Sequence, residues 1–302
     1  MQSIISGEKV TWIDLENPTE EELIDIANEY NIHPLVANDL QRQIFRPKID
    51  TYDSFLYLVL HFPFYKGADA QGHETDFIIG QNFLVTVRYQ KIPTLAAFMT
   101  SCKEDKSINK QYLSGSSGKL LYHLLSQLFV SSIKSLEVID QSITKVENSI
   151  FKTHRRDMIE RILELRRDIL DLRRIVQPQE PILVALSEQG KKFFGKDIAP
   201  YLNNITGDYL RVWHMLENHK EMIEALQDSN ESLISMRTAE ITKNLTIIAF
   251  VTLPLSLLAN IFSMNTHNIP IIGAQYDFWI IIAIMLLAVI GLFVYFKSKR
   301  WI

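Results

Sequence analysis

Two long uncharged runs near the C-terminus restrict what this chain can fold into. Residues 245–262 read LTIIAFVTLPLSLLANIF, and residues 278–296 read FWIIIAIMLLAVIGLFVYF. At about 1.5 Å per residue, helices of these lengths reach about 27 and 28 Å, close to the hydrocarbon thickness of a bilayer. Two buried helices of a soluble protein are the alternative, but two successive uncharged runs of this length argue against it. The sequence therefore predicts two membrane spans.

The basic residues around these runs predict the orientation of the spans. Lys297, Lys299 and Arg300 follow the second run, and Arg237 and Lys243 precede the first. The link between the runs, SMNTHNIPIIGAQYD, contains no Lys or Arg. Because cytoplasmic segments collect Lys and Arg, we expect both termini in the cytoplasm and the link outside. The predicted location is an inner or plasma membrane.

Composition and motifs exclude several other classes of protein. The net charge of −4 gives no basic face for a nucleic acid. The single cysteine, Cys102, excludes an intrachain disulfide and is expected to be an inert, small apolar residue. The start MQSIISGEKVTW lacks the pattern of a cleavable signal peptide. No phosphate-binding loop, nucleophile elbow or metal-hydrolase helix is recognisable, so we expect neither an enzyme nor a covalent cofactor.

The first 116 residues mix strand and helix patterns, which predicts an α/β layer. WIDLENPTEEE reads as a short strand followed by a helix that Asn17 or Thr19 caps, with acidic residues in its first turn. SFLYLVLHF and DFIIGQNFLVTVRY predict three more strands, the last two turning at Gly80-Gln81-Asn82. The segment FYKGADAQGHE between them is expected to be a hairpin turn or loop.

A helical period replaces this pattern from about Ser117 onward. Pro178, Pro181 and the segment GKKFFGKDIAPYL interrupt it, and from Tyr201 one helix can run into the first span. Such a helix of some sixty residues would reach about 90 Å. It needs neighbouring copies to bury its apolar stripe, and two spans cannot enclose a pore alone, so an oligomer is expected.

These patterns predict an α+β cytoplasmic domain with a very long stalk helix that continues into the first of two C-terminal transmembrane helices. The expected regions are an N-terminal α/β domain (1–116), a helical hairpin region (117–200), a stalk helix with the first span (201–262), an extracytoplasmic loop (263–277), the second span (278–296) and a basic tail (297–302).

The first uncharged run and the residues around it read KNLTIIAFVTLPLSLLANIFSMN, and the chain ends with VYFKSKRWI. In these two segments the chain resembles the CorA magnesium transporters, in which a Gly-Met-Asn signature follows the first span and the ending is similar. The blocks WIDLENPTEEE, IHPLVANDL and RPKIDTYDSFLYLVL agree in the same order. The resemblance covers nearly the whole chain and implies a homopentameric funnel that conducts divalent cations, Mg²⁺ first and Co²⁺ or Ni²⁺ as further candidates.

The resemblance implies a selectivity loop formed by Ser263, Met264 and Asn265 at the outer mouth. A ring of Asn265 amides would contact the waters of hydrated Mg²⁺, which that ion releases reluctantly. The expected pore-lining positions lie on one helical stripe: Asp228, Glu231, Ser235, Thr242, Leu253 and Ser256. Asp228 and Glu231 are equally compatible with a solvated surface, and Leu253 with a lipid or helix contact instead of a dewetting gate.

Three positions depart from the family pattern. Ser263 replaces the signature glycine, which would cost about 1 kcal/mol if the turn were left-handed. Ile271 replaces the glutamate expected after the proline, which weakens cation attraction at the mouth. Asn204 stands where the family often has an aspartate of a regulatory metal site between subunits, with Asp208 as its substitute and Asp69 as a candidate partner.

Two alternatives remain open at this point. His267 in the outer loop is a possible zinc ligand, although an exposed loop histidine is the plainer interpretation. A zinc transporter of the same superfamily is therefore one alternative to a magnesium channel. A membrane-anchored scaffold or sensor that does not conduct is the other.

Overall fold

The computed structural model describes the chain except for residues 1, 66–69, 151–155, 265–270, 274 and 300–302. The chain divides into two compact units, Met1–Gln227 and Asp228–Ile302. The 64-residue helix α8 (Ala199–Phe262) belongs to both units. Its presence confirms the predicted stalk helix that continues into the first apolar run.

Unit 1 is built on a six-stranded sheet with the strand order β1-β2-β6-β5-β4-β3. All neighbouring pairs are antiparallel except the parallel pair β2 and β6. The strands are β1 (Gln2–Ser6), β2 (Thr11–Glu16), β3 (Lys48–Thr51), β4 (Phe55–Tyr65), β5 (Ala70–Gly80) and β6 (Phe83–Arg88). β4 is buried over nearly its whole length, as expected of a strand that is covered on both faces.

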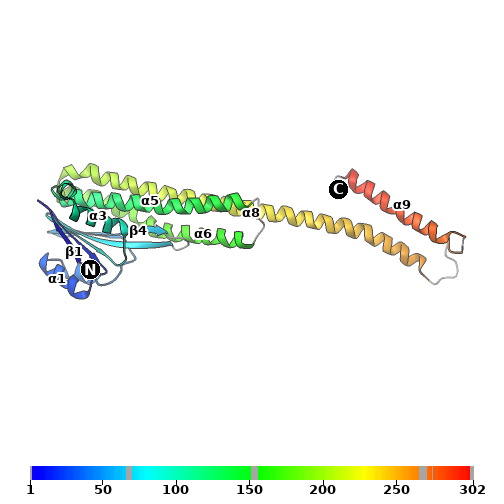
Figure 1. Ribbon diagram of the computed structural model, residues 1–302, viewed down its shortest axis with the longest axis horizontal. Coiled ribbons are helices and arrows are strands. Elements are labelled where there is room, and N and C mark those ends of the chain that lie inside the picture. Colours follow the sequence, from blue (N-terminus) through cyan, green and yellow to red (C-terminus); the bar gives the residue numbers. More distant parts are fainter. Residues whose placement is uncertain (1, 66–69, 151–155, 265–270, 274, 300–302) are drawn as a thin grey trace. The chain divides into compact units, whose positions relative to one another are not determined.

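Alternate residues of these strands form two apolar layers. On one face, Ile13, Tyr57 and Val85 pack with α1 (Glu20–Glu29) and α2 (Pro34–Asp39). On the other face, Phe62 of β4 contacts Phe129 of α5 (Ser117–Ile150), with 5.3 Å between ring centroids. Figure 1 shows α1 and α5 on opposite sides of the sheet.

The predicted helix start after β2 is confirmed in detail. Thr19 is the N-cap residue: its side chain accepts a hydrogen bond from the backbone N–H of Glu22, and the Glu22 side chain accepts one from the backbone N–H of Thr19. This capping box satisfies two backbone donors that the first helical turn leaves unpaired. Of the two predicted caps, Thr19 therefore has this role, and Asn17 instead adopts a positive φ of 44° in the preceding turn.

The segment FYKGADAQGHE, predicted to be a hairpin turn or loop, connects two antiparallel strands, and these strands extend further into it than predicted. β4 continues to Tyr65 and β5 begins at Ala70, so only residues 66–69 of this segment lie outside the described residues. Packing against α6 (Arg156–Val176) explains the difference. A Cβ at Gly72 would lie 2.9 Å from Ile175 of that helix, so the absent side chain lets the strand approach it.

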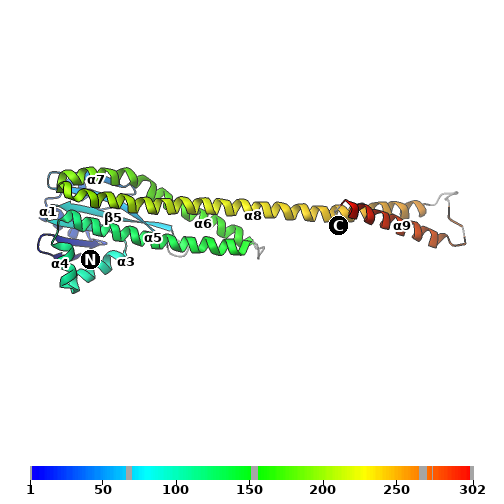
Figure 2. The same ribbon diagram turned by 90° about the horizontal axis from the view of Figure 1, so that it is seen from above.

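Helices complete unit 1. They include α3 (Pro93–Glu104), α4 (Lys106–Leu113), α7 (Glu180–Phe194) and the short 3₁₀ turns Gln177–Gln179 and Lys196–Ile198. These two turns and Gly195, at φ 92°, coincide with the predicted breaks near Pro178 and in GKKFFGKDIAPYL. α5 and the first part of α8 run side by side in both views (Figures 1 and 2), where Phe129 contacts Tyr209.

Unit 2 contains the rest of α8, the link and α9 (Asp277–Ser298). Both helices are long and apolar enough to cross a membrane, with mean hydropathies of 2.1 and 2.8 over their most apolar windows, and none of either window is buried. Phe250 of α8 and Phe296 of α9 contact each other with ring centroids 6.4 Å apart. The two predicted spans therefore correspond to these two helices.

Candidate ion pathway and signature loop

The six predicted pore positions share one face of α8 in unit 2. At 3.6 residues per turn, Asp228, Glu231, Ser235, Thr242, Leu253 and Ser256 fall within about 80° of one another. All six are exposed within the single chain. Five half-buried residues of the span lie on the opposite side of the helix: Ile247, Val251, Leu255, Leu258 and Phe262. Thr246, at the edge of the stripe, is half-buried as well. Apart from Thr246, the polar stripe is therefore turned away from the side of the helix that packs within its own unit.

Threonine hydroxyls extend this stripe, and the sequence analysis singled out only one of them. Thr238, Thr242 and Thr246 each donate a hydrogen bond to the backbone carbonyl four residues earlier, at 3.0, 2.8 and 2.7 Å. Their hydroxyl protons are thereby used within the helix, while the oxygen lone pairs still accept hydrogen bonds. Thr238 and Thr246 could have been predicted to lie on the stripe, because each is four residues away from Thr242 in the sequence.

The first span ends at Phe262, directly before the predicted selectivity loop. The backbone N–H of Ser263 donates to the carbonyls of Ala259 at 3.0 Å and Asn260 at 3.2 Å, and that of Met264 donates to Ile261 at 3.3 Å. Ser263 is not among the described residues with positive φ, so serine costs no left-handed strain at this position. Asn265 and His267 lie outside the described residues.

The end of the link has a defined local structure. Ile271 has a φ of 87°, a left-handed conformation that a β-branched side chain rarely adopts. Gly273, at φ 100°, donates its backbone N–H to a carboxylate oxygen of Asp277 at 3.2 Å. Asp277 thus closes the turn and places a negative charge in the first turn of α9, where the helix dipole favours it.

The residues proposed for a regulatory metal site face α5 of the same chain. Asn204 donates a hydrogen bond of 3.2 Å to the hydroxyl of Tyr122, and Asp208 accepts one of 3.2 Å from Ser126. The two α8 residues are one turn apart, as the sequence suggested. Asp69 lies outside the described residues. Within the described part of the chain, no group of three His, Cys, Asp or Glu side chains is arranged to hold a metal ion.

A buried acidic pair in the sheet is a feature that the sequence analysis missed. The Tyr57 hydroxyl donates to Asp76 at 3.0 Å, and the neighbouring Glu74 accepts from the His61 ring at 3.1 Å. Burial, and then the charge of Glu74, raise the pKa of Asp76 well above its usual range. The pair anchors the segment after α2, because Glu74 also accepts the backbone N–H of Ile44 at 2.8 Å.

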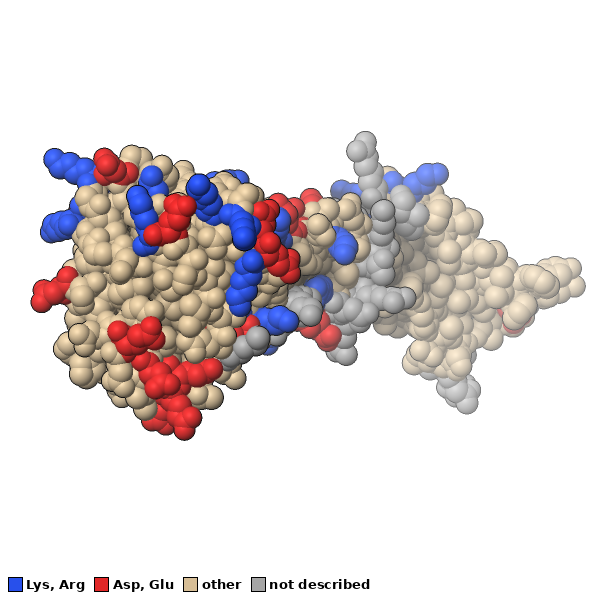
Figure 3. Space-filling model, turned by 60° about the vertical axis from the view of Figure 1, so that its left-hand side comes forward, with Lys and Arg blue, Asp and Glu red and all other residues tan. Residues whose placement is uncertain are grey.

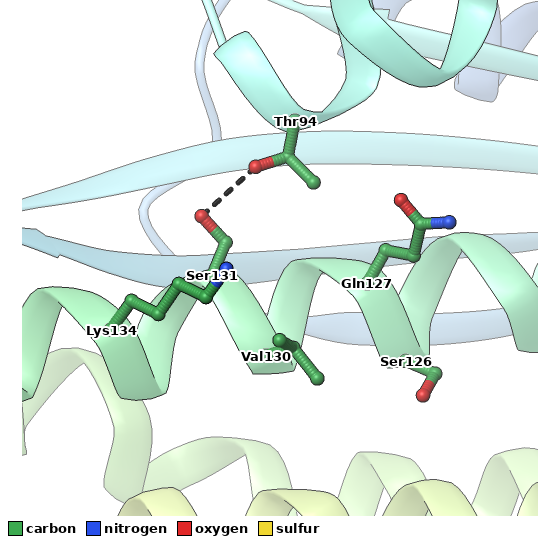
Figure 4. Close-up of a pocket in the computed structure, with 6 residues that line it drawn as sticks. All are labelled: Thr94, Ser126, Gln127, Val130, Ser131 and Lys134. Atoms are coloured by element: carbon green, nitrogen blue, oxygen red, sulfur yellow. Dashed lines mark hydrogen bonds between the residues drawn. The ribbon is translucent and has the colours of Figure 1, made fainter. Parts of the chain in front are cut away.

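Two surface hollows on unit 1 are poor sites for a divalent cation. One, of about 240 Å³, is lined by Thr94 of α3 and by residues of α5 that include Lys134, and Thr94 donates to Ser131 at 2.9 Å (Figure 4). None of its lining residues carries a carboxylate. In the other, the carboxylates of Asp14 and Glu16 are already paired with Arg88, at 2.8 and 2.7 Å.

Acidic side chains gather on α1, whose first turn contains Glu20, Glu21 and Glu22. They form a patch at the lower edge of unit 1 in Figure 3. Acidic residues at a helix N-terminus stabilise the helix through its dipole, which accounts for this patch.

Comparison with known proteins decides the family. Residues 7–300 match the family described as "CorA-like Mg2+ transporter protein". This chain belongs to that family. The CorA-like chain is 24% identical over 295 residues to the cobalt/magnesium transport protein CorA of Thermotoga maritima, covering 97% of this chain and 83% of that protein.

Further relatives agree with this assignment. The magnesium transport protein CorA of Helicobacter pylori strain 26695 is 24% identical over 305 residues, covering 99% of this CorA-like chain and 92% of that protein. The solved structure of the CorA magnesium transporter from Methanocaldococcus jannaschii superposes with a TM-score of 0.87 at 20% identity, covering 99% of this chain and 94% of that one. The family and the fold predicted from sequence are therefore confirmed, and the chain is a membrane transporter and not an enzyme.

Proposed function

We propose that this chain forms a channel that passes Mg²⁺ as a hydrated ion, with α8 lining the path. The observation that carries the proposal is the polar stripe of α8, which lies opposite the half-buried face and continues through the first span to the signature. Within lipid, a row of hydroxyl and amide groups is stable where it lines water or other polar groups. The relatives from Thermotoga maritima and Helicobacter pylori are named as a cobalt/magnesium and a magnesium transport protein. These names support the choice of Mg²⁺ as the ion.

A pore requires several copies of the chain. Two spans cannot enclose a path, and α8 exposes large apolar side chains in unit 2, among them Ile241, Leu245 and Ile248 at 60%, 62% and 61%. Neighbouring copies would bury these side chains around a central axis. The number five comes from the resemblance to the CorA family. Both termini then lie in the cytoplasm, because the basic residues flank the spans on that side.

Three side chains along the proposed path have distinct roles. Asp228 concentrates cations at the cytoplasmic end of the path, since a ring of like charges attracts counter-ions. Leu253, which is 69% exposed in the single chain, forms an apolar constriction. The constriction blocks ions while it is dry and lets them pass when water fills it. Asn265 offers neutral amide oxygens to the water shell of the ion, and neutral ligands release the ion more readily than carboxylates would.

The regulatory role of Asn204 and Asp208 is a further part of the proposal. Their side chains point toward α5, so a metal bound near them would couple α5 to the stalk. Replacement of the family's aspartate by Asn204 removes one anionic ligand. We therefore expect weak inhibition by internal Mg²⁺, with Asp208 supplying the remaining carboxylate.

The test is ion entry into liposomes. The purified protein is reconstituted, and the entry of Mg²⁺, Co²⁺ and Zn²⁺ is followed with internal dyes for the unaltered chain and for Asn265→Ala. We expect Mg²⁺ entry that the substitution abolishes. The variant must retain the oligomeric size of the unaltered protein, so that a lost signal reports on the ion path and not on assembly.

The other results would overturn the proposal in distinguishable ways. Entry of Zn²⁺ without Mg²⁺ would favour a zinc transporter and make His267→Ala the next variant to study. No entry of any ion through an intact oligomer would indicate a scaffold or sensor that does not conduct.

A further inference from the structure

Asn260 is the only side-chain amide in the uncharged run 245–262, and neither the fold nor the signature accounts for it. It lies on α8 three residues before Ser263, about 4.5 Å along the helix axis. It therefore lies within the last two turns of the span, on the cytoplasmic side of the signature loop.

The helical position of Asn260 places it on the polar stripe. It follows Leu253 by seven residues and Ser256 by four, so the three side chains fall within about 60° of one another at 3.6 residues per turn. The half-buried residues Leu258 and Phe262 flank it in sequence but lie on the opposite face. Asn260 itself is exposed in the single chain, as are Leu253 and Ser256.

The Asn260 side chain has no hydrogen-bond partner among the described residues. Its backbone carbonyl accepts the N–H of Ser263 at 3.2 Å, which is an ordinary contact of the helix end. An unpaired amide that faces hydrocarbon costs free energy, because lipid offers neither donor nor acceptor. A position against water or against the same residue in other copies removes that cost, and the stripe supplies such a position.

We propose that Asn260 lines the ion path and that its copies form a second ring of amides, one step inside the signature loop, that contacts the waters of a hydrated divalent cation. This inference rests on the proposed function for the identity of the ion. An amide ring suits a hydrated cation because its oxygens accept hydrogen bonds from coordinated water, while its lack of charge keeps the ion from being held tightly. Two such rings in succession allow the ion to move stepwise between them.

The orientation of Asn260 can be tested without measuring transport. In a Cys102→Ser background, which removes the only native thiol, Asn260→Cys and Ile261→Cys are exposed to a cationic, membrane-impermeant methanethiosulfonate reagent. The fraction modified is read by mass. Ile261 is the matched control, because it lies one residue nearer the outer surface but on a different side of the helix. We expect modification of Asn260→Cys, slowed when Mg²⁺ is present, and little modification of Ile261→Cys.

Two results would overturn this assignment. Equal or faster modification of Ile261→Cys would mean that depth, and not the stripe, governs access. Modification of Asn260→Cys at a rate that Mg²⁺ does not change would remove the contact with the ion. Both readouts are obtained even if the unaltered chain transports nothing, so failure of this inference and failure of the proposed function are distinguishable.

Transport supplies the second readout. For Asn260→Ala we expect the Mg²⁺ concentration at half-maximal entry to rise between about twofold and tenfold, the range that corresponds to a lost hydrogen bond. Asn260→Gln, which keeps the amide, should restore part of the effect. Entry that is unchanged in Asn260→Ala at every Mg²⁺ concentration would contradict a coordinating role.

Discussion

His219 of α8 is buried in unit 1 with its Nε2 3.6 Å from a carboxylate oxygen of Asp140 on α5. Its Nδ1 is buried without a hydrogen-bond partner among the described residues. The contact ties the stalk helix to α5 just before the end of unit 1, and it makes the packing of these helices sensitive to protonation.

We expect the stability of unit 1 to fall as the pH is lowered through this histidine's range. Burial lowers the pKa of His219, and Asp140 opposes the shift only in part. The folded chain therefore binds the proton more weakly than the unfolded chain, whose histidine pKa is about 6.5, so stability is present above that pH and declines below it. The measurement is the denaturation midpoint of the full chain in detergent between pH 8 and pH 5.

The variant His219→Gln separates the effect of His219 on stability from the effects of other titrating groups. Asp76 has a raised pKa, and its contribution has the opposite sign, since it is lost as the pH rises. The difference in midpoint between the unaltered chain and His219→Gln removes the contribution of Asp76. A difference that stays constant with pH would show that His219 does not titrate within this range.

Arg88→Met should destabilise unit 1 strongly. Arg88 and Asp14 are both buried, and the guanidinium lies 2.8 Å from the carboxylate. Removing Arg88 leaves the buried Asp14 carboxylate without its cationic partner, a loss of about 3–5 kcal/mol in the free energy of unfolding. Chemical denaturation measures it. The control is Arg174→Met, whose partner Asp171 lies 3.4 Å away on the exposed surface and whose loss should have little effect.

Cys102 should be unreactive in the folded protein. It is 1% exposed on α3, and burial raises the pKa of its thiol to about 11, so the thiolate is scarce at pH 7.5. Ellman's reagent should modify it only after denaturant is added. Rapid modification of the native protein would mean that α3 opens readily and would require the cysteine-free background for every labelling experiment.

Ser263→Gly should change Mg²⁺ entry by no more than about twofold. Ser263 does not have the positive φ that favours glycine, so a glycine at this position relieves no strain. Ile271→Glu is the informative companion, because a carboxylate near the outer mouth attracts cations and should increase entry at low Mg²⁺ and low ionic strength. A large gain from Ser263→Gly would imply a different loop conformation during transport.

Much of this architecture could be predicted from the sequence because the signals were local. The capping box at Thr19 and Glu22, the uncharged spans and the helix breaks near Pro178 and Gly195 each depend on nearby residues. The length of the β4–β5 hairpin could not be predicted this way. Gly72 indicates a turn locally, and only its contact with Ile175, about a hundred residues later, explains a strand.

The same distinction applies to the candidate site. Helical spacing places Asp228, Ser235 and Ser256 on one face of α8, and all three are exposed in the single chain, while their pore-lining role stays a prediction. The pairing of Asp76 with Tyr57 depends on strand register, which the sequence pattern did not specify. Asn260 was not predicted, because the predicted stripe comprised acidic, hydroxyl and leucine side chains, and a ring of amides was expected only at Asn265.

The central claim is that one face of α8 lines the path of the ion. Mg²⁺ entry into liposomes, compared between Thr242→Lys and Ile241→Lys, tests it most directly. Both positions are exposed and adjacent in the chain, but only Thr242 lies on the stripe. We expect a lysine ring at Thr242 to repel cations and abolish entry, while Ile241→Lys, at equal oligomer content, retains most of it. Equal loss of entry in both variants, or retained entry in Thr242→Lys, would contradict the account.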